Sequence, residues 1–434
     1  MPEISHWDMT TSIDLSFGES HLSVAIESER LLGIALPTEE SGATSTELRS
    51  GIVRYALNNT DGPLLREIVE SDHRVAIVIS DLTRPCPSDR ILPDLLEELA
   101  HVPDDQIEII VALGLHRPMT EAEIREAVGE PVRERLRVIN HDPDRTVSLG
   151  TTSRGTPVEI FEPLVKADIR ICVGNVEFHY FAGYSGGAKA VLPGCASQAA
   201  VTANHSMMVS HGAAVGRLDD NPIRQDIEEA GELVGVHFIV NVVVDSEQEI
   251  VAAFAGDVFR AHRAACEWVS ERGSVPVSGM ADIVLLGAGG HPTDLNLYQA
   301  QKALDNACGI VREGGIVIWV AECREGFGNQ TFESWMRDAD GPQAVLDRIQ
   351  RQFVLGGHKA AAVAGVQKRA RIYLVSRMSA ADVAACGLTP FESVQQALKQ
   401  AYAELGVTAK VLVMPRGGST HPVIGGAATV GALG

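Results

Sequence analysis

Short apolar runs alternate with helical patterns along most of the chain. The runs are rich in β-branched residues, and many of the segments between them carry apolar positions three and four residues apart. The strand-like runs cover residues 74–80, 106–113, 136–140, 169–173, 237–244, 281–286, 315–321, 370–376 and 409–414. Continuous apolar strands that alternate with helices are typical of parallel sheets buried on both faces. The pattern therefore predicts an α/β fold.

The length of the chain and one connecting segment predict its division into domains. At 434 residues the chain exceeds a single ordinary core, and Val-Pro-Val-Ser-Gly at residues 275–279 is typical of an interdomain connection. We predict two Rossmann-like domains with mainly parallel sheets and the active site in the cleft between them. The first covers residues 1–274, completed by 405–434, and the second covers 275–404. Alternating positions at residues 11–17 and 22–26 predict a small β-hairpin or meander at the edge of the first domain.

Polar side chains follow two of the predicted strands. Asp81 and Arg84 come directly after the strand at 74–80, and His116 follows the strand at 106–113. Open parallel sheets bind their ligands at the carboxyl ends of the strands, so these side chains are candidates for a binding site. The alternatives are a loop-bracing Asp81–Arg84 pair and a packed or solvent-facing His116, and position alone does not separate them.

The most informative stretch follows the fourth strand-like run. Ser185, Gly186 and Gly187 precede a short helix predicted at residues 188–192. Small residues at a strand-to-helix turn let backbone N–H groups approach an anion, and the helix N-terminus adds a favourable dipole. Lys189 in this turn could hold a phosphate or act as a nucleophile toward an acyl or carbonyl group.

Three histidines lie after strands or near this turn. His116, His179 and His205 could bind zinc or exchange protons near neutral pH. None of them stands in a His-x-His, His-Glu-x-x-His or Cys/His spacing, so the sequence pattern leaves both roles open.

A second glycine-rich turn lies in the last third of the chain. Residues 287–290 follow a strand but lack the Gly-x-Gly-x-x-Gly spacing of a nicotinamide-binding fold. The helix predicted after this turn carries Tyr298, Gln299 and Lys302, with Gln299 and Lys302 on one face. A binding role and a solvated helix face are both open for these three residues.

The charge of the chain restricts its partners. The formal net charge is −21, which argues against nucleic-acid binding because that function needs basic surface. The molecule as a whole would repel a small anionic substrate, so an anion site must be built from local cations. Arg84, Lys189 and Lys302 are the candidates because each lies in a motif-like stretch.

The remaining composition predicts a cytoplasmic protein. The seven cysteines are scattered and form no Cys-x-x-Cys pair, which indicates reduced thiols. The apolar runs are only as long as strands, so we expect no membrane span. The N-terminal residues lack the basic and apolar regions of a secretory signal. The oligomeric state is left open.

Several motifs occur together in a characteristic order. They are Asp81-x-Thr83-Arg84-Pro85, Gly114-x-His116-Arg117, His179-x-x-Ala182-Gly183-Tyr184-Ser185-Gly186-Gly187-Ala188-Lys189, His205, Tyr298-Gln299-x-x-Lys302 and Leu355-Gly356-x-His358-Lys359-Ala360. Over residues 81–360 the chain resembles the nickel-pincer-nucleotide lactate racemase family, which interconverts 2-hydroxy acid stereoisomers. Tyr184 stands where phenylalanine is common in that family, a mild departure.

The resemblance implies a cofactor and the residues that hold it. The family's cofactor is a pyridinium mononucleotide, the pyridinium-3,5-bisthiocarboxylic acid mononucleotide, in which two sulfur atoms and one ring carbon bind nickel. Lys189 would carry this group covalently through a thioamide, and His205 would be the protein's nickel ligand, which suits imidazole. Asp81 and Thr83 would also contact the cofactor. The turn formed by Ser185, Gly186 and Gly187 would face its phosphate.

The resemblance also implies a mechanism. The substrate's α-hydrogen moves as a hydride to the cofactor while a histidine takes the hydroxyl proton, and the hydride returns to either face of the resulting 2-keto acid. His116 and His179 match the two acid/bases. The substrate would be bound by Arg84, Lys302, Gln299 and Tyr298, with arginine suited to a carboxylate.

The implied partners are a small 2-hydroxy acid and separate cofactor-maturation enzymes. Lactate, malate, longer hydroxy acids and sugar acids share the carboxyl–hydroxyl unit that these residues address, so the sequence does not fix the substrate. The alternatives are a zinc- or NAD-dependent α/β enzyme acting on a hydroxy or keto acid, and a non-catalytic protein that binds a nucleotide or hydroxy acid.

Overall fold

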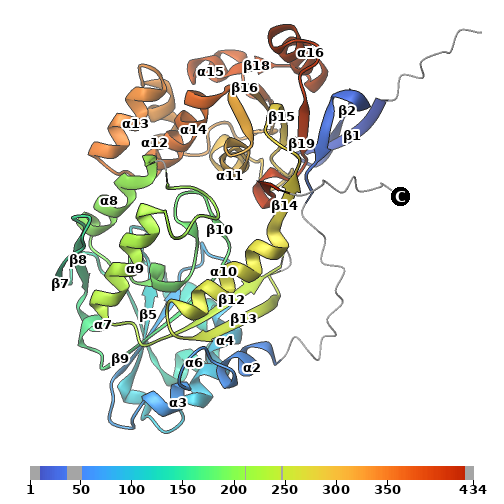
Figure 1. Ribbon diagram of the computed structural model, residues 1–434. Helices are drawn as coiled ribbons and strands as arrows, with labels where there is room; N and C mark the ends of the chain where they lie inside the picture. The colour runs from blue at the N-terminus through green and yellow to red at the C-terminus, as the bar shows by residue number, and fades with distance from the viewer. Residues whose placement is uncertain (1–9, 37–50, 211, 246–247, 426–434) are drawn as a thin grey trace, which may run out of the picture. The chain divides into compact units, whose positions relative to one another are not determined.

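Two compact units make up the chain. The computed structural model describes residues 10–36, 51–210, 212–245 and 248–425 (Figure 1). One unit, here called the central unit, is Glu40–Glu271. The other, here called the terminal unit, combines Met1–Glu39 with Arg272–Gly434.

A six-stranded sheet forms the middle of the central unit. Its order is β13-β12-β9-β4-β5-β6, and every neighbouring pair is parallel except β12 with β13. The strands are β4 (Val75–Ser80), β5 (Ile107–Ala112), β6 (Arg137–Asn140), β9 (Ile169–Asn175), β12 (Phe238–Val244) and β13 (Ile250–Gly256). Ile77, Ile109 and Ile171 in three adjacent strands are fully buried. The apolar runs thus became buried parallel strands, as predicted.

Helices and short strands surround this sheet. The helices are α2 (Ile52–Asn58), α3 (Leu65–Ile68), α4 (Ser88–Glu98), α5 (Glu121–Val128), α6 (Glu130–Arg135), α7 (Glu162–Lys166), α8 (Gln198–Ser206), α9 (Pro222–Val234) and α10 (Arg260–Gly273). Two small antiparallel pairs join β7 (Thr146–Thr151) to β8 (Pro157–Phe161) and β10 (Phe178–His179) to β11 (Gly183–Tyr184). Side-chain caps fix several helix starts; Thr120, for example, accepts the N–H of Glu123 at 3.3 Å in a capping box.

The terminal unit repeats this plan with a fully parallel sheet. Its order is β18-β17-β16-β15-β19-β3. The strands are β3 (Leu31–Ile34), β15 (Ala281–Gly287), β16 (Val311–Val320), β17 (Arg371–Val375), β18 (Thr389–Phe391) and β19 (Val411–Met414). The helices are α11 (Leu297–Cys308), α12 (Gln330–Arg337), α13 (Gly341–Arg351), α14 (Gly357–Arg369), α15 (Ala380–Ala385) and α16 (Val394–Leu405). Both units therefore have the predicted Rossmann-like α/β architecture.

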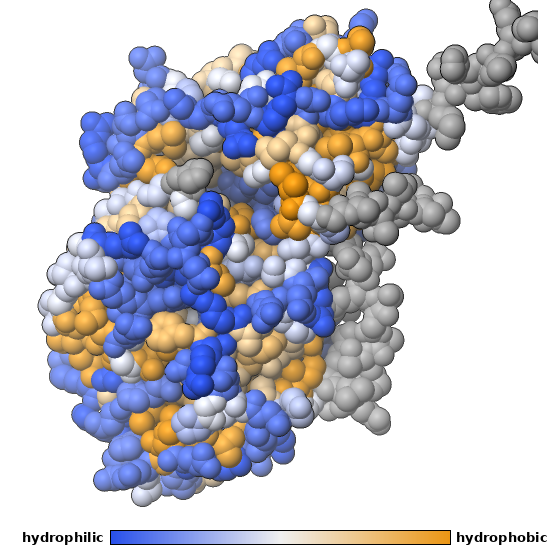
Figure 2. Space-filling view, viewed as in Figure 1, coloured by the Kyte–Doolittle hydropathy of each residue, from blue (hydrophilic) through white to orange (hydrophobic). Residues whose placement is uncertain are grey.

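Two strand pairs lie outside the six-stranded sheet of the terminal unit. β1 (Thr10–Phe17) and β2 (Ser20–Glu27) form the predicted antiparallel hairpin. β14 (Ser274–Val277) pairs in parallel with β20 (His421–Ile424). Among the described helices, none is long and apolar enough to cross a membrane. The face seen in Figure 2 is largely hydrophilic, with apolar residues in small groups between polar ones.

The prediction that residues 1–274 and 405–434 form one domain was wrong at both ends of the chain. The boundary near residue 274 lies close to the observed division, but the hairpin and the last strands belong to the other unit. The reason is long-range pairing: β19 lies between β15 and β3, with Leu31 opposite Val411. In Figure 1 the blue hairpin lies beside β19, in the unit that carries the yellow and red segments.

The corrected division makes a testable prediction about stability. Leu15 on β1 is fully buried and belongs to a core cluster with Ile283 and Leu285 of β15. Leu15→Ala should therefore destabilise the terminal unit by about 2–5 kcal/mol and leave the central unit unchanged. Hydrogen exchange measured by mass spectrometry should show faster exchange in β15 and β16 but not in β4 and β5. Ser12→Ala, an exposed position on the same strand, is the matched control.

Faster exchange in β4 and β5 of the Leu15→Ala protein, with β15 and β16 unaffected, would show that the hairpin supports the central unit instead.

Candidate active site

The candidate residues of the central unit gather at the carboxyl end of its sheet. From the central β4 the chain builds outward through β5 to β6, then returns to place β9 and β12 on the other side of β4. The order in which strands are added therefore reverses between β4 and β9. Open α/β sheets form their ligand sites at such a reversal. Asp81 follows β4, and the loop that carries His179 and Lys189 follows β9.

Asp81 and His116 form a hydrogen-bonded pair at this edge. The Nδ1 atom of His116 lies 2.5 Å from Oδ2 of Asp81, and Thr83 donates to Oδ1 through its N–H at 3.0 Å and its hydroxyl at 2.6 Å. Burial raises the pKa of Asp81, but the bonds from His116 and Thr83 outweigh it, so the pKa lies below its ordinary value. An ionised carboxylate only accepts hydrogen bonds, so His116 donates through Nδ1.

The Asp81 carboxylate thus pairs with His116, and among the described residues it forms no ion pair with the Arg84 side chain. The prediction that Asp81 and Thr83 contact a cofactor is not tested by these contacts. Thr83 holds the Asp81 carboxylate, and the carboxylate orients the ring of His116. Because Nδ1 carries the hydrogen of the neutral ring, the free lone pair of His116 is on Nε2. The Gly114 N–H donates to the Gly194 carbonyl at 2.9 Å, which ties the His116 loop to the segment after Lys189.

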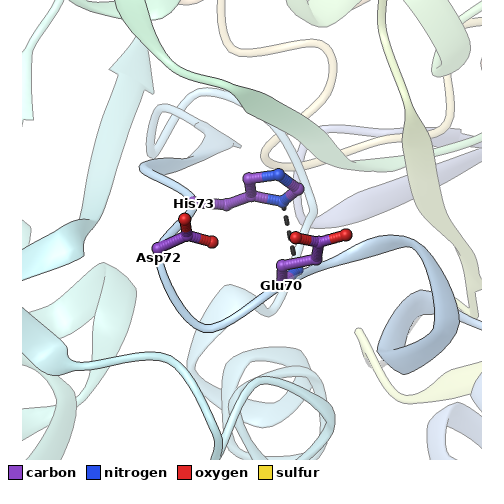
Figure 3. A group of neighbouring side chains, drawn as sticks. All are labelled: Glu70, Asp72 and His73. Atoms are coloured by element: carbon purple, nitrogen blue, oxygen red, sulfur yellow. Dashed lines mark hydrogen bonds between the residues drawn. The ribbon is translucent and has the colours of Figure 1, made fainter.

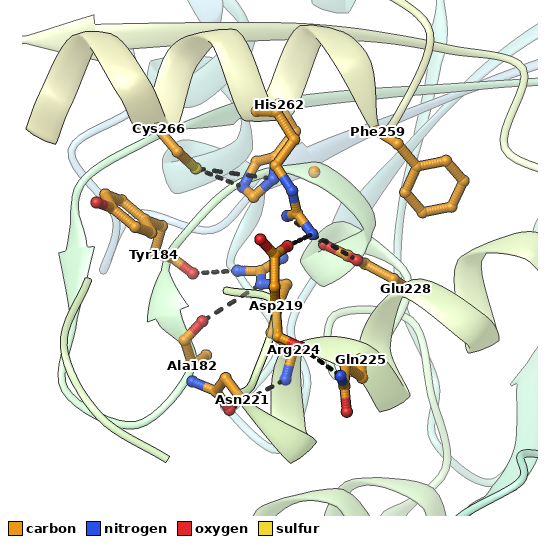
Figure 4. A network of polar contacts seen from close by, with 12 residues as sticks. Ala182, Tyr184, Asp219, Asn221, Arg224, Gln225, Glu228, Phe259, His262 and Cys266 are labelled. Atoms are coloured by element: carbon orange, nitrogen blue, oxygen red, sulfur yellow. Dashed lines mark hydrogen bonds and ion pairs between the residues drawn. The ribbon is translucent and has the colours of Figure 1, made fainter. Parts of the chain in front are cut away.

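Buried side chains from the first turn of α9 hold the loop after β9 (Figure 4). Asn221 Nδ2 donates to the carbonyl of Phe181 at 2.8 Å. Arg224 Nε donates to the carbonyl of Ala182 at 3.3 Å, and its Nη2 donates to that of Tyr184. Three carbonyl groups of a loop are thereby satisfied by side chains, as buried backbone groups require.

The other end of the loop is held in the same way. His262 Nε2 bonds to the carbonyl of Ser185 at 2.8 Å, and Asn241 Oδ1 accepts the N–H of Gly187 at 2.9 Å. The Ser185 N–H donates to the Glu177 carbonyl at 2.9 Å. The N–H groups of Ser185 and Gly187 therefore bond within the protein, which does not support the predicted anion cradle.

The short helix predicted at residues 188–192 is present only in part. The structure has a four-residue 3₁₀ segment, Gly187–Ala190, without a helix long enough to carry a dipole. Gly186 and Gly187 have φ of 76° and 59°, and a side chain at Gly187 would meet the ring of His262. The glycines are needed here because the backbone turns in the left-handed region under a packed histidine.

Lys189 and His179 face each other in this loop. The Nζ atom of Lys189 lies 3.5 Å from Nε2 of His179 and 5.6 Å from the centre of the Phe181 ring. The Ala182 N–H donates to Nδ1 of His179 at 3.3 Å. A neutral His179 therefore carries its proton on Nε2, which faces Lys189.

Burial and neighbouring cations favour the neutral forms of both side chains. Burial lowers the pKa of Lys189 well below its ordinary value, and Arg224 and Arg84 lower it further against the opposing effect of Glu177. Burial is also the largest cause of the lowered pKa of His179, and the charges of Lys189, Arg84, His205 and Arg224 lower it further. The lowered pKa therefore favours the neutral, nucleophilic form of the Lys189 amine.

Arg224 is the residue of this site that sequence analysis missed. Its side chain is fully buried, its Nη1 has no hydrogen-bond partner among the described residues, and burial lowers its pKa to about 10. The available signal was an arginine between Ile223 and Ile227 on the apolar stripe of a helix. A buried cation adjoining Lys189 adds to the positive charge that Arg84 supplies.

His205 lies near the end of α8 and is buried. Its ring packs edge-on against Phe181, with 4.9 Å between the ring centres, and Phe181 packs in the same way against His179 at 4.5 Å. The aromatic ring thus joins His205 to the His179–Lys189 pair. The Oδ1 atom of Asn204 lies 3.1 Å from Nδ1 of His205.

The remaining predicted residues lie in the terminal unit. Tyr298, Gln299 and Lys302 are on α11, whose cap Asn296 accepts the Gln299 N–H at 3.0 Å. Tyr298 is partly buried, whereas Gln299 and Lys302 are exposed. Lys359 of α14, which the sequence motifs included without a role, donates to the Tyr298 carbonyl at 2.6 Å and lies over its ring.

Lys359 differs from a surface lysine. Burial lowers its pKa to about 7, and the nearby Lys302 lowers it as well, while Asp305 opposes the shift. Its ammonium lies 4.3 Å from the centre of the Tyr298 ring. Lys359 therefore supports the start of α11, where the predicted substrate-binding residues stand.

A separate group of possible metal ligands lies away from these residues in the chain (Figure 3). Ligand atoms of Glu70, Asp72 and His73 come within 4.8 Å of one another. Both acidic residues are exposed, and the His73 Nδ1 already accepts the Glu70 N–H at 3.0 Å. This group is an exposed loop contact and shares no residue with the predicted site.

Two family models match the chain in separate segments. The lactate racemase N-terminal domain matches residues 17–216, and the lactate racemase C-terminal domain matches residues 277–421. The chain belongs to the lactate racemase family.

Individual members of the lactate racemase family are similar over almost the whole chain. The lactate racemase of Thermoanaerobacterium thermosaccharolyticum is 33% identical over 419 residues, covering 94% of this chain and 98% of that protein. The lactate racemase of Lactiplantibacillus plantarum is 34% identical over 418 residues, with the same coverage. The solved structure of the Thermoanaerobacterium apoprotein has a TM-score of 0.85 and 32% identity, covering 95% of this chain and 100% of that chain.

In this lactate racemase family member, the lowered pKa of Lys189 makes a prediction about reactivity. Trace acylation with acetic anhydride at pH 7, followed by peptide mass spectrometry, should modify Lys189 more readily than Lys166, an exposed lysine paired with Glu162. The advantage should shrink as the pH rises toward 10, because ordinary lysines then lose their protons too.

Equal or slower modification of Lys189 throughout this pH range would contradict a neutral, accessible amine at this position.

Proposed function

We propose that this chain interconverts the stereoisomers of a small 2-hydroxy acid such as lactate. As a member of the lactate racemase family, the chain is an isomerase. The observation that carries the proposal is the presence of two histidine pairs, His116 with Asp81 and His179 with Lys189, after strands at one edge of the same sheet. Racemisation needs proton transfer for both stereoisomers, and two histidines supply it.

His116 is the better defined of the two proposed acid/bases. Asp81 accepts from Nδ1, fixes the ring and stabilises the imidazolium that forms when Nε2 takes a proton. Thr83 holds the carboxylate in turn, so neither partner of the hydrogen bond rotates freely. The proposed role of His116 is to take the substrate's hydroxyl proton at Nε2 and to return it.

His179 is proposed as the second acid/base. In the described structure Nδ1 accepts the Ala182 N–H at 3.3 Å, so the neutral ring carries its hydrogen on Nε2. To take a proton at Nε2, His179 must carry its hydrogen on Nδ1 instead, so the proposed role requires the ring to give up its bond from Ala182. The low pKa of His179 reflects burial first and the surrounding cations second, and an anionic substrate would reduce the effect of those cations.

The residues of the central unit fit the family's cofactor. The lowered pKa of Lys189 favours its neutral amine, which suits a covalent thioamide bond, and His205 is a buried imidazole suited to nickel. Arg84 and Arg224 supply positive charge for a nucleotide phosphate in a protein of net charge −21. We propose that Lys189 carries the nickel pincer nucleotide and that His205 ligates its nickel. The bound group would supply a hydride acceptor for the substrate's α-hydrogen.

Substrate binding and maturation complete the proposal. Arg84, Lys302, Gln299 and Tyr298 are proposed to bind the carboxylate and hydroxyl of the substrate, as the family resemblance implies. Arg84 is exposed beside the Asp81–His116 pair in the chain, so its guanidinium is open to a carboxylate. The proposed partners are the enzymes that make and insert the cofactor.

The first test is production of the chain together with cofactor-making enzymes. We expect racemisation of L- or D-lactate or another 2-hydroxy acid by chiral chromatography, about one nickel per chain, and a nucleotide-sized adduct on the peptide that contains Lys189. Lys189→Arg should lose the adduct and at least about 100-fold in kcat, whereas Lys166→Arg should change neither.

A matured protein with no nickel, no adduct and no racemisation across a panel of 2-hydroxy acids would overturn the proposal. Bound zinc or a dissociable nicotinamide would instead favour a different α/β enzyme.

The two histidines can be tested separately. His116→Ala and His179→Ala should each lower kcat by about 10²–10⁴-fold while nickel and adduct content stay unchanged. Asp81→Asn should lower kcat in the same direction and change its pH profile, because the amide can leave His116 in the wrong tautomer. His21→Asn on the exposed edge of β2 is the control. Near-normal turnover in both directions by either alanine variant would refute the two-histidine assignment.

A further inference from the structure

A line of buried hydrogen bonds ends at His205. Asp226 on α9 is fully buried, and its carboxylate accepts from Thr152 at 2.5 Å, Thr156 at 2.8 Å and the Asn204 amide at 2.7 Å. Asn204 is fully buried as well, and its Oδ1 lies 3.1 Å from Nδ1 of His205. The line therefore runs from a carboxylate through an amide to the imidazole.

The orientation of the Asn204 amide follows from its partners. One end of the amide faces two acceptors, Oδ2 of Asp226 and the carbonyl of Ile223 at 3.3 Å, so that end must be the NH₂ group. The opposite end is then the oxygen, and it faces His205 Nδ1. Because this oxygen carries no hydrogen, His205 must donate from Nδ1. A neutral imidazole holds one such hydrogen, so its lone pair lies on Nε2.

We propose that Asn204 and Asp226 are positioning residues that hold His205 in the Nδ1–H tautomer, which assigns Nε2 as its metal-binding atom. This inference rests on the proposed function, in which His205 ligates nickel. A metal binds the nitrogen that has no hydrogen, and a hydrogen bond from the other nitrogen fixes the tautomer and the ring. Asn204 supplies that bond without placing a carboxylate directly against the ring.

A purely structural role does not account for the last bond in the line. The bonds of Asp226 to Thr152 and Thr156 connect α9 to the segment between β7 and β8, so they contribute to packing. Asn204 and His205 are neighbours in sequence on α8, and a bond between them connects no separate elements. Its effect is to choose the orientation and the hydrogen position of the His205 ring.

The tautomer can be measured in the cofactor-free protein. Histidine-selective ¹⁵N labelling at about pH 8.5, where ordinary imidazoles are neutral, distinguishes Nδ1–H from Nε2–H by chemical shift. His205, identified by the signal lost in His205→Gln, should report Nδ1–H. His262 and His101 are internal references for Nε2–H, because their Nε2 atoms face the carbonyls of Ser185 and Val69 at 2.8 Å. An Nε2–H signal from His205 would overturn the proposal.

A variant then tests what the tautomer does for the metal. Asn204→Leu keeps a similar side-chain size but removes the acceptor, so His205 should lose its preference for Nδ1–H. Nickel retention by the matured protein during dialysis against a chelator should fall by about 10–100-fold. Unchanged His262 and His101 signals show that the variant is folded. If this variant does not fold, the tautomer of His205 measured in the wild-type protein still tests the proposal.

The outcomes separate this inference from the proposed function. Equal nickel retention by wild type and Asn204→Leu, with the tautomer changed, would overturn the positioning role and leave the nickel proposal standing. A matured wild-type protein that holds no nickel overturns the proposed function, and with it the metal-directed role of Asn204, whatever tautomer the spectrum shows.

Discussion

The site depends on burying an irregular loop. The segment between β9 and the 3₁₀ turn at Gly187–Ala190 has only two short bridging strands of its own, yet most of its residues from Phe181 to Gly187 are buried. Its backbone polar groups need partners that regular structure does not provide. Asn221, Arg224, Asn241 and His262 supply them from inside the unit, which explains why strongly polar side chains occupy core positions of α9, β12 and α10.

The same burial sets the chemistry of the loop. Partial burial of Lys189 and His179 disfavours their charged forms, and the cationic Arg224 that holds the loop adds to the effect. One residue therefore both supports the backbone and lowers the pKa of the neighbouring amine. Arg224 forms no ion pair within hydrogen-bonding distance among the described residues, and a buried charge of this kind is costly. Its presence in a protein with 57 acidic residues points to a function that needs local positive charge.

The sequence predicted those features that local patterns determine. Continuous apolar runs such as 75–79 are readable because a strand buried on both faces excludes polar residues. The strand that pairs with β3 could not be predicted from the sequence. Leu31 pairs with Val411, which lies near the other end of the chain, and no local pattern encodes this pairing. The helix predicted at 188–192 is present only in part for a different reason: Gly186 and Gly187 take positive φ values, which close a tight turn instead of opening a helix.

The candidate site was predictable as a set of motifs but not as a set of contacts. His116 stands 35 residues after Asp81 and 33 after Thr83, and only the adjacency of β4 and β5 brings it within hydrogen-bonding distance of them. Arg224 and Asn204 were not readable, since an arginine or asparagine in a helix is most often exposed. Both side chains contribute to the site because they are buried, and the sequence indicates this burial only through the apolar residues around them.

The two histidines of the proposed mechanism have opposite electrostatic surroundings. Asp81 accepts the Nδ1–H of His116, whereas Lys189, Arg84 and Arg224 disfavour protonation of His179. An acid/base in a reversible reaction must both take up and release its proton, which the lowered pKa of His179 opposes. A thioamide on Lys189 would remove the positive charge that this lysine can carry. An anionic substrate beside Arg84 would offset the positive charge of that arginine. Filling the proposed site would therefore remove part of what lowers the pKa of His179, so attachment of the cofactor would also make this histidine a better proton acceptor.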